Sequence, residues 1–172
     1  MTMFGNVMKI NLICDKPIIM ANTYLRIYLH LVFAVKNRNA LILPHWKNRV
    51  YAYIAQALRD GDHYPIIIGG MPDHVHILLG YSGKEALPDM VRRVKVGCTK
   101  FINEQRITPF KFEWQKGYGC FSYSHSHLPQ VIKYIENQEQ HHSKQSVVAE
   151  MKRMLNAFDV VYDESYIFVE PT

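Results

Sequence analysis

An alternating run over residues 24–36 constrains the fold of this chain more than any other stretch. One set of alternate positions is entirely apolar, whereas the other mixes apolar residues with Arg26, Tyr28 and His30. Because successive side chains of a β-strand point to opposite faces of a sheet, this period of two predicts a long strand. Its apolar face is expected to meet the core, and its mixed face is left for a ligand, a helix or a partner.

Further strand and helix patterns follow this run in a defined order. Apolar residues recur at helical spacing in two segments, and short apolar runs bounded by Gly, Pro or Asp predict the other strands. The helical segments are residues 44–60 and 84–105; strands are expected in 64–68, 71–79 and, as one or two short pieces, 110–123. The order strand–helix–strand–strand–helix–strand predicts an α+β, ferredoxin-like (RRM-like) fold, an antiparallel sheet with helices on one face. Its first and third strands are adjacent, so residues 71–79 are expected beside His30.

Two more helices are expected after the sheet. The first covers residues 126–142, with Ser126 as its cap and Pro129 in its first turn. The second covers residues 146–158, and the tail 159–169 contains a candidate strand.

Composition and charge narrow the class of protein. The 172 residues are 48% hydrophobic and 20% charged, which fits one globular domain. We expect that domain over residues 22–172, with 1–21 as an extension that is either flexible or strand-like. A net charge of +5 is a mild indication of an anionic partner such as nucleic acid. The three cysteines are widely spaced, and no apolar run is long enough to span a bilayer, so neither disulfides, a zinc knuckle nor a membrane partner is expected.

Residues 71–79 contain the first candidate for chemistry. His74 and His76 flank one apolar residue on a predicted strand, so both imidazoles lie on the same face and could hold one metal ion. Such a pair also occurs for packing or on surfaces, and a metal site would need a third ligand and a reacting group. Asp73 either orients His74 through a hydrogen bond or only forms the preceding turn.

The predicted helix over residues 126–142 offers both missing parts. Tyr134 and Gln138 are four residues apart, so they project together. The Gln138 amide oxygen could complete a site begun by two imidazoles, and the Tyr134 phenol could attack a phosphodiester polarised by a metal. The resulting phosphotyrosine ester would suit breaking and rejoining of DNA. The alternative is that Tyr134 is a half-buried helix tyrosine with a polar tip.

Together these motifs resemble the HUH endonuclease superfamily, and within it the single-strand insertion-sequence transposases with one catalytic tyrosine, the TnpA type. The resemblance extends over about residues 22–168; besides the Tyr134 helix it rests on segments 28–33, 70–76 and 114–119. It implies a metal-dependent enzyme that cleaves and rejoins single-stranded DNA at insertion-sequence ends through a 5′-phosphotyrosine intermediate. It also implies a C-terminal helix that carries the nucleophile.

The resemblance assigns roles to single residues. His74, His76 and Gln138 match the metal ligands of the family, and Tyr134 matches its nucleophile. The family's metal is Mg²⁺ or Mn²⁺, while imidazole ligands alone favour Mn²⁺ or a later transition metal. Family members are homodimers with active sites shared between subunits, act on single-stranded DNA with hairpin ends, and belong to the cytoplasm of bacteria or archaea.

Several alternatives stay open. Tyr123 is a rival nucleophile, although His127 instead of Gln occupies its i+4 position. The chain could also be a domesticated relative that handles chromosomal repeat hairpins, or a non-catalytic nucleic-acid-binding module. A separate metal cluster, or a polar surface, could form from His125, His127, His141 and His142. Candidate phosphate contacts, which could equally be solvated surface, are Lys36, Arg38, Arg92, Arg93, Lys100 and Lys116.

Overall fold

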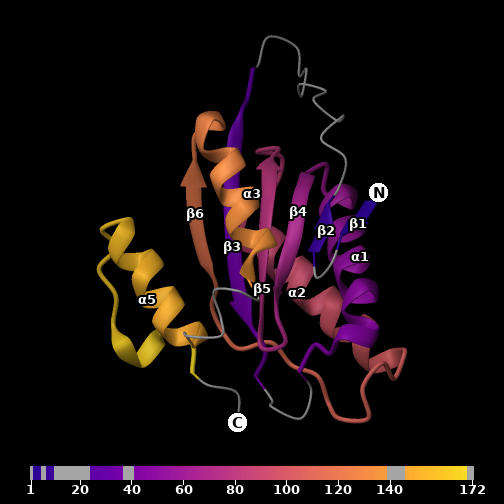
Figure 1. Ribbon diagram of the computed structural model, residues 1–172. Coiled ribbons are helices and arrows are strands. Elements are labelled where there is room, and N and C mark those ends of the chain that lie inside the picture. Colours follow the sequence, from indigo (N-terminus) through magenta and orange to yellow (C-terminus); the bar gives the residue numbers. More distant parts are fainter. Residues whose placement is uncertain (1, 5–6, 10–23, 37–40, 139–145, 170–172) are drawn as a thin grey trace.

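A six-stranded antiparallel sheet in the order β1-β2-β4-β5-β3-β6 forms the centre of the computed structural model (Figure 1). The structure describes residues 2–4, 7–9, 24–36, 41–138 and 146–169. The strands are β1 Thr2–Phe4, β2 Val7–Lys9, β3 Ile27–Ala34, β4 Tyr64–Met71, β5 His74–Tyr81 and β6 Gly119–Tyr123.

The four strands β4-β5-β3-β6, with helices α1 (Pro44–Asp60) and α2 (Leu87–Glu104), confirm the predicted ferredoxin-like order. Strand β3 pairs with β5 along its whole length, so the strand of His74 and His76 lies beside the strand of His30, as predicted. The N-terminal strands β1 and β2 extend this sheet beyond β4. The described residues of the N-terminal extension are therefore strand-like, one of the two alternatives predicted for it.

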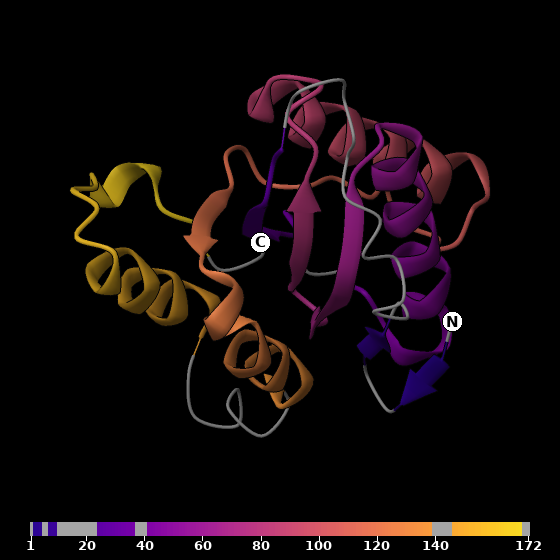
Figure 2. The same cartoon turned by 90° about the horizontal axis from the view of Figure 1, so that it is seen from above.

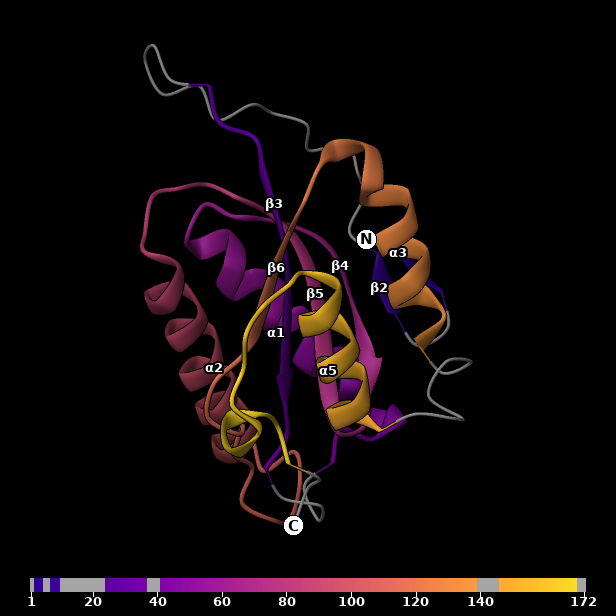
Figure 3. The ribbon, with the colours of Figure 1, turned by 90° about the vertical axis from the view of Figure 1, so that its left-hand side faces the viewer.

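The two faces of the sheet are covered by different pairs of helices. Helices α1 and α2 lie on one face, and α3 (Leu128–Glu136) and α5 (Val147–Ala157) lie on the other (Figure 2, Figure 3). The apolar side of β3, including Leu31 and Phe33, is buried in the main core, as its alternation predicted. The mixed side of β3 faces α3, and Tyr28 is buried there.

Helix α3 packs closely on the sheet because Gly69 of β4 has no side chain beneath it. Val131 and Ile135 of α3 are buried in a second apolar cluster with Ile67 of β4. A Cβ atom at Gly69 would lie 2.7 Å from Ile135 Cγ2, a distance that side chains do not tolerate. Gly69 pairs with His76 across the sheet, so the close approach brings α3 directly over the histidine strand.

The start of α3 differs from the prediction. Ser126 does not cap the helix: residues His125–His127 form a 3-10 turn, and His127 precedes α3 without a side-chain cap. Pro129 does lie in the first turn, as predicted. The helix ends at Glu136, with Asn137 after it in a non-helical conformation, so α3 is shorter than the predicted helix to residue 142.

The C-terminal part also differs. Helix α5 begins as expected after Ser146, whose hydroxyl accepts a hydrogen bond from the Ala149 amide. The strand expected in 159–169 is wrong, since that stretch contains only the 3-10 turn Glu164–Tyr166. Of residues 110–123, only β6 is a regular strand. Among the described residues, no helix is both long and apolar enough to cross a membrane.

Candidate active site

Strand β5 presents His74 and His76 on the face covered by α3 and α5. Both side chains are completely buried, with ring centroids 4.9 Å apart. His74 Nδ1 donates to the Asp73 carboxylate at 2.7 Å, which confirms the orienting role considered for Asp73. This bond leaves His74 Nε2 directed into the site, because the hydrogen bond of one ring nitrogen fixes the orientation of the other.

His30 supports His76 in the same way. His30 Nε2 and His76 Nδ1 are 2.9 Å apart, in a buried hydrogen bond between neighbouring strands. Burial and the nearby His76 lower the pKa of His30 well below its ordinary value, so His30 is a neutral ring. When His76 donates through Nδ1, the lone pair of its Nε2 points into the site and can bind a metal.

Tyr134 of α3 faces the histidines, and Gln138, two residues after the end of α3, contacts the same Glu150 carboxylate as Tyr134. The Tyr134 ring centroid is 5.8 Å from that of His76 in the same chain. Burial, and then the charge of Glu150, raise the pKa of Tyr134 above its ordinary value. Tyr134 and Gln138, which are four residues apart, thus both reach the Glu150 carboxylate, as their predicted proximity requires.

Glu150 of α5 is the site residue that the sequence reasoning missed. Its carboxylate is 3% exposed and lies 3.3 Å from His74 Nε2 and 3.4 Å from His76 Nε2. It also accepts hydrogen bonds from the Tyr134 hydroxyl and, at 3.0 Å, from Gln138 Nε2. A signal was present in the sequence, because Glu150 interrupts the buried stripe of α5 formed by Val147, Glu150, Met151 and Met154.

These side chains fit a metal ion. One ligand atom each from His74, His76 and Glu150 lies within 4.8 Å of the others, and all three residues are buried. The Gln138 Oε1 atom is also buried and accepts no hydrogen bond from the described residues. Two imidazoles with a carboxylate or amide oxygen form a mixed nitrogen and oxygen set that suits a divalent metal.

The charge of the site changes the pKa of His74. Burial by itself lowers this pKa, but the hydrogen bonds and charges of Asp73 and Glu150 outweigh burial and raise the pKa to about 9. A proton and a metal ion would compete for the same His74 nitrogen.

Arg153 lies one turn after Glu150 on α5 and completes the surroundings of the phenol. Its Nη2 atom donates to Tyr134 Oη at 2.9 Å, and its guanidinium lies 5.6 Å from the centroid of the Tyr134 ring. An arginine beside a phenol oxygen favours negative charge on that oxygen.

The other predicted site residues are dispersed. The basic residues of α2 bind acidic neighbours: Arg92 pairs with Asp89 at 2.8 Å, Arg93 with Glu85 at 2.5 Å and Lys100 with Glu104 at 3.7 Å. Lys36 pairs with Glu113 at 2.9 Å, Lys116 is exposed, and Arg38 lies outside the described residues. Their contact with DNA stays a prediction.

The two described alternative histidines, His125 and His127, do not join the site. The His125 ring lies 5.9 Å from that of Tyr28, and His127 accepts or donates a hydrogen bond with Ser124 at 2.7 Å. His141 and His142 lie outside the described residues. Tyr123, the rival nucleophile, has its ring 6.1 Å from that of His30.

Comparison with known proteins decides the family. The sequence model described as "Transposase IS200 like" matches residues 23–138. The chain belongs to the IS200-like transposase family. Membership assigns it to DNA transposition and confirms the resemblance inferred from the motifs. The family match ends at Gln138, so Glu150 and Arg153 lie outside it.

Individual relatives agree with this assignment. The chain is 26% identical over 114 residues to the ISDra2 transposase TnpA of Deinococcus radiodurans, a match that covers 63% of this chain and 81% of the relative. A crystal structure from D. radiodurans R1, of a protein provisionally named a transposase, is 22% identical with a TM-score of 0.54 and covers 68% of this chain and 94% of its own. The structure of a REP-associated tyrosine transposase bound to a REP hairpin is 16% identical with a TM-score of 0.54, over 72% of this chain and 73% of its own. Both structures show the fold.

Proposed function

We propose that this transposase is metal-dependent and cuts and rejoins single-stranded DNA through a 5′-phosphotyrosine at Tyr134. The observation that supports this proposal is the convergence of a half-buried tyrosine, two buried histidines and a buried glutamate at one place. Metal-assisted attack by a phenol on a phosphodiester needs this set of groups.

The metal would be held by His74 and His76, with the Glu150 carboxylate and the Gln138 amide oxygen beside them. We propose Mn²⁺ or Mg²⁺, and the two imidazoles favour Mn²⁺. When bound, the ion supplies a Lewis acid that polarises the scissile phosphate.

The chain's own residues handle the proton and the charge. The Tyr134 hydroxyl already donates to Glu150, so this carboxylate is placed to accept the proton as Oη attacks phosphorus. The bond between phosphorus and the 3′ oxygen breaks, and that oxygen leaves as a 3′ hydroxyl after taking up a proton. The 5′ phosphate stays on Tyr134, next to Arg153. A later 3′ hydroxyl attacks the phosphotyrosine, rejoins the strand and releases Tyr134.

A non-catalytic RNA-recognition module fits the structure less well. Such modules stack bases on aromatic residues of an open sheet face. Here α3 and α5 cover the sheet face that carries His30 and His76, and both histidines are completely buried.

The DNA partner that we propose has hairpin ends, by analogy with the REP hairpin to which the second structural neighbour is bound. We also propose a homodimer with shared active sites. In this chain, Tyr134 lies beside its own His76, so sharing would require the α3 segment to exchange between subunits. A mixture of Tyr134→Phe and His76→Ala proteins tests this: activity regained on mixing requires a shared site, and no recovery contradicts it.

The decisive experiment uses labelled, hairpin-bearing single-stranded DNA with a randomised unpaired flank, incubated with Mn²⁺. We expect a denaturant-stable adduct with the wild type, none with Tyr134→Phe, and DNA binding without cleavage for His74→Ala. Tyr166→Phe, which changes an 87% exposed tyrosine, is the matched control and should form the adduct. No adduct with the wild type, or an adduct that persists in Tyr134→Phe and disappears in Tyr123→Phe, would overturn the proposal.

A further inference from the structure

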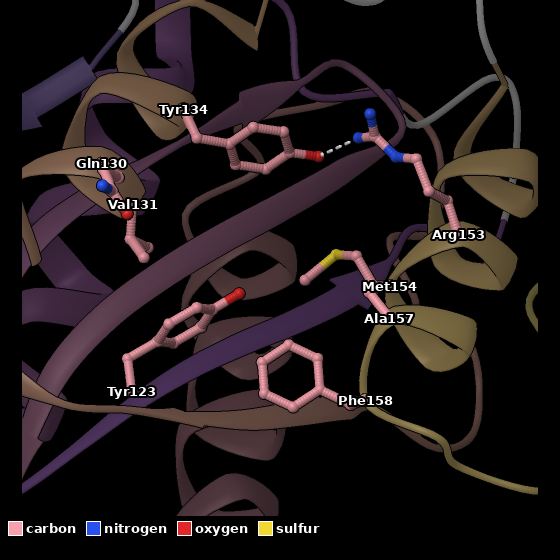
Figure 4. A pocket seen from close by; sticks show the side chains of 8 residues that line it. All are labelled: Tyr123, Gln130, Val131, Tyr134, Arg153, Met154, Ala157 and Phe158. Carbon is pink, nitrogen blue, oxygen red and sulfur yellow. Dashed lines mark hydrogen bonds between the residues drawn. The ribbon is translucent and has the colours of Figure 1, made fainter. Parts of the chain in front are cut away.

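A largely apolar pocket of about 290 Å³ opens beside the phenol of Tyr134, between β6, α3 and α5 (Figure 4). Its walls include Tyr123, Val131, Tyr134, Arg153, Met154 and Phe158. The Tyr134 ring lies on one side of the space and the rings of Tyr123 and Phe158 lie on the other, with Met154 projecting between them. The proposed chemistry at Tyr134 Oη does not account for this pocket.

The composition of the pocket suits a flat aromatic ligand. The rings of Tyr123 and Phe158 pack edge to face, with an interplanar angle of 82° and centroids 5.3 Å apart. Nucleobases stack on aromatic side chains with little dependence on sequence, and an unbranched methionine adapts to the shape of its neighbour. Arg153 adds one cation at the edge next to the Tyr134 hydroxyl.

The position of the pocket identifies which base could enter. A phosphate attacked by Tyr134 Oη lies at the end of the Tyr134 side chain, where Arg153 donates its hydrogen bond. The two nucleotides joined by that phosphate carry their bases within one sugar of it. The same tyrosine forms a wall of the pocket, so a base adjacent to the scissile phosphate reaches the pocket without a separate binding segment.

We propose that this pocket binds the unpaired base of one of the two nucleotides flanking the scissile phosphate, while Arg153 contacts the phosphate itself. The proposal rests on the proposed function and adds a base-binding subsite to it. Half of the pocket, including Arg153 and Phe158, comes from the chain beyond the family match at residues 23–138. The proposed subsite therefore depends on the C-terminal segment of this chain as well as on the matched region.

The test removes one base at a time from the DNA strand that forms the Tyr134 adduct. Each abasic oligonucleotide is compared with the intact strand for adduct rate with wild-type protein and for dissociation constant with Tyr134→Phe, which keeps the ring. We expect one abasic position next to the cut to lower the rate and weaken binding by about tenfold, the usual scale for loss of one stacked base. Abasic positions farther along the unpaired strand should have small effects.

Two protein variants connect that position to the pocket. Phe158→Leu keeps apolar volume but removes a flat ring, and Ala157→Trp fills the space from an exposed position on α5. Each variant is made in the Tyr134→Phe protein. Each should bind the intact strand about tenfold more weakly than Tyr134→Phe does, and should bind the abasic strand as well as Tyr134→Phe does. Phe110→Ala, a change at a 52% exposed phenylalanine outside the pocket, is the control and should leave the difference between the strands intact.

The outcomes separate the two proposals. If the adduct forms normally but no abasic position next to the cut matters, or if the pocket variants respond like Phe110→Ala, the base subsite is wrong and the proposed function stands. If no strand gives an adduct with the wild type, the proposed function fails, and the subsite that rests on it fails too.

Discussion

Among the described residues, two clusters combine histidine, glutamate and arginine, and only one of the two is arranged for chemistry. In the first, His63 Nε2 donates to Glu85 at 2.9 Å and His63 Nδ1 accepts from the Ser82 amide at 3.1 Å. Arg93 holds the same carboxylate at 2.5 Å. Because both ring nitrogens of His63 are hydrogen-bonded, neither is available to bind a metal. The cluster instead joins the first turns of α2 to the end of α1, where Arg93 donates to the Ala57 carbonyl.

The second cluster differs in where its nitrogens point. Asp73 and His30 each engage the outer nitrogen of one histidine, so the Nε2 atoms of His74 and His76 both face Glu150. A phenol donates to the same carboxylate. Residue types alone therefore do not define a metal site. The site requires two imidazoles whose Nδ1 atoms are held by hydrogen bonds, so that both Nε2 atoms point to the same carboxylate.

The largest expected difference between the clusters is in metal binding. We predict that Glu150→Gln weakens Mn²⁺ binding to the DNA-free protein by more than about a hundredfold, since a ligand should matter more than the 10–100-fold typical of a residue that supports one. Glu85→Gln should bind Mn²⁺ like the wild type. Isothermal titration calorimetry measures both constants. Normal affinity in Glu150→Gln, with loss of affinity in Gln138→Ala, would instead make Gln138 the third ligand.

The next effect concerns the outer hydrogen bonds of the histidines. Asp73→Asn should weaken Mn²⁺ affinity about 10–100-fold while the protein stays folded, because His74 loses the carboxylate that orients it. His30→Phe should act similarly through His76. Circular dichroism controls for folding during the titration. Unchanged affinity in both variants would mean that the ligands need no support from these neighbours.

A smaller effect is expected on stability at the first cluster. Glu85→Ala should lower the free energy of unfolding by about 1–2 kcal/mol, because His63 and Arg93 lose their shared acceptor. At this chain length that corresponds to about 2–4 °C in Tm for each kcal/mol. Glu104→Ala, which removes an exposed pair with Lys100, is the control and should cost at most about 0.5 kcal/mol. Equal losses in the two variants would reduce the first cluster to a surface ion pair.

The smallest effect is on pH dependence. Burial lowers the pKa of His63 below its ordinary value, despite the hydrogen bond to Glu85 that raises it. The unfolded chain therefore takes up a proton at a pH where the folded chain does not, so His63 reduces stability as the pH falls through about 6.5.

Removing this histidine tests the sign. Between pH 7 and 5, with EDTA present, His63→Asn should lose less stability than the wild type, by a difference on the order of 1 kcal/mol. Denaturant unfolding at each pH measures it. The exposed control His45→Asn should follow the wild type. A steeper acid loss in His63→Asn would show that the sign is the opposite.

Local patterns predicted much of the fold because the elements that they describe are regular. Helix α1 occupies residues Pro44–Asp60 as expected, and β3 lies within the alternating run 24–36. The predictions were weaker where tertiary contacts decide. Residues 110–123 contain one of the one or two short strands expected there, whereas the strand expected in 159–169 is absent: its described residues contain a 3-10 turn and pair with no described strand.

The candidate site divides in the same way. The sequence by itself determined that His74 and His76 share one face of a strand and that Tyr134 and Gln138 share one side of a helix, since both follow from backbone periodicity. Only the tertiary structure decided that α5 turns Glu150 toward those four residues and Arg153 toward the phenol. These contacts join residues that are far apart in the sequence, and helix or strand periodicity relates only residues that are close together in it. They depend on how α3 and α5 pack over the sheet, which no local pattern specifies.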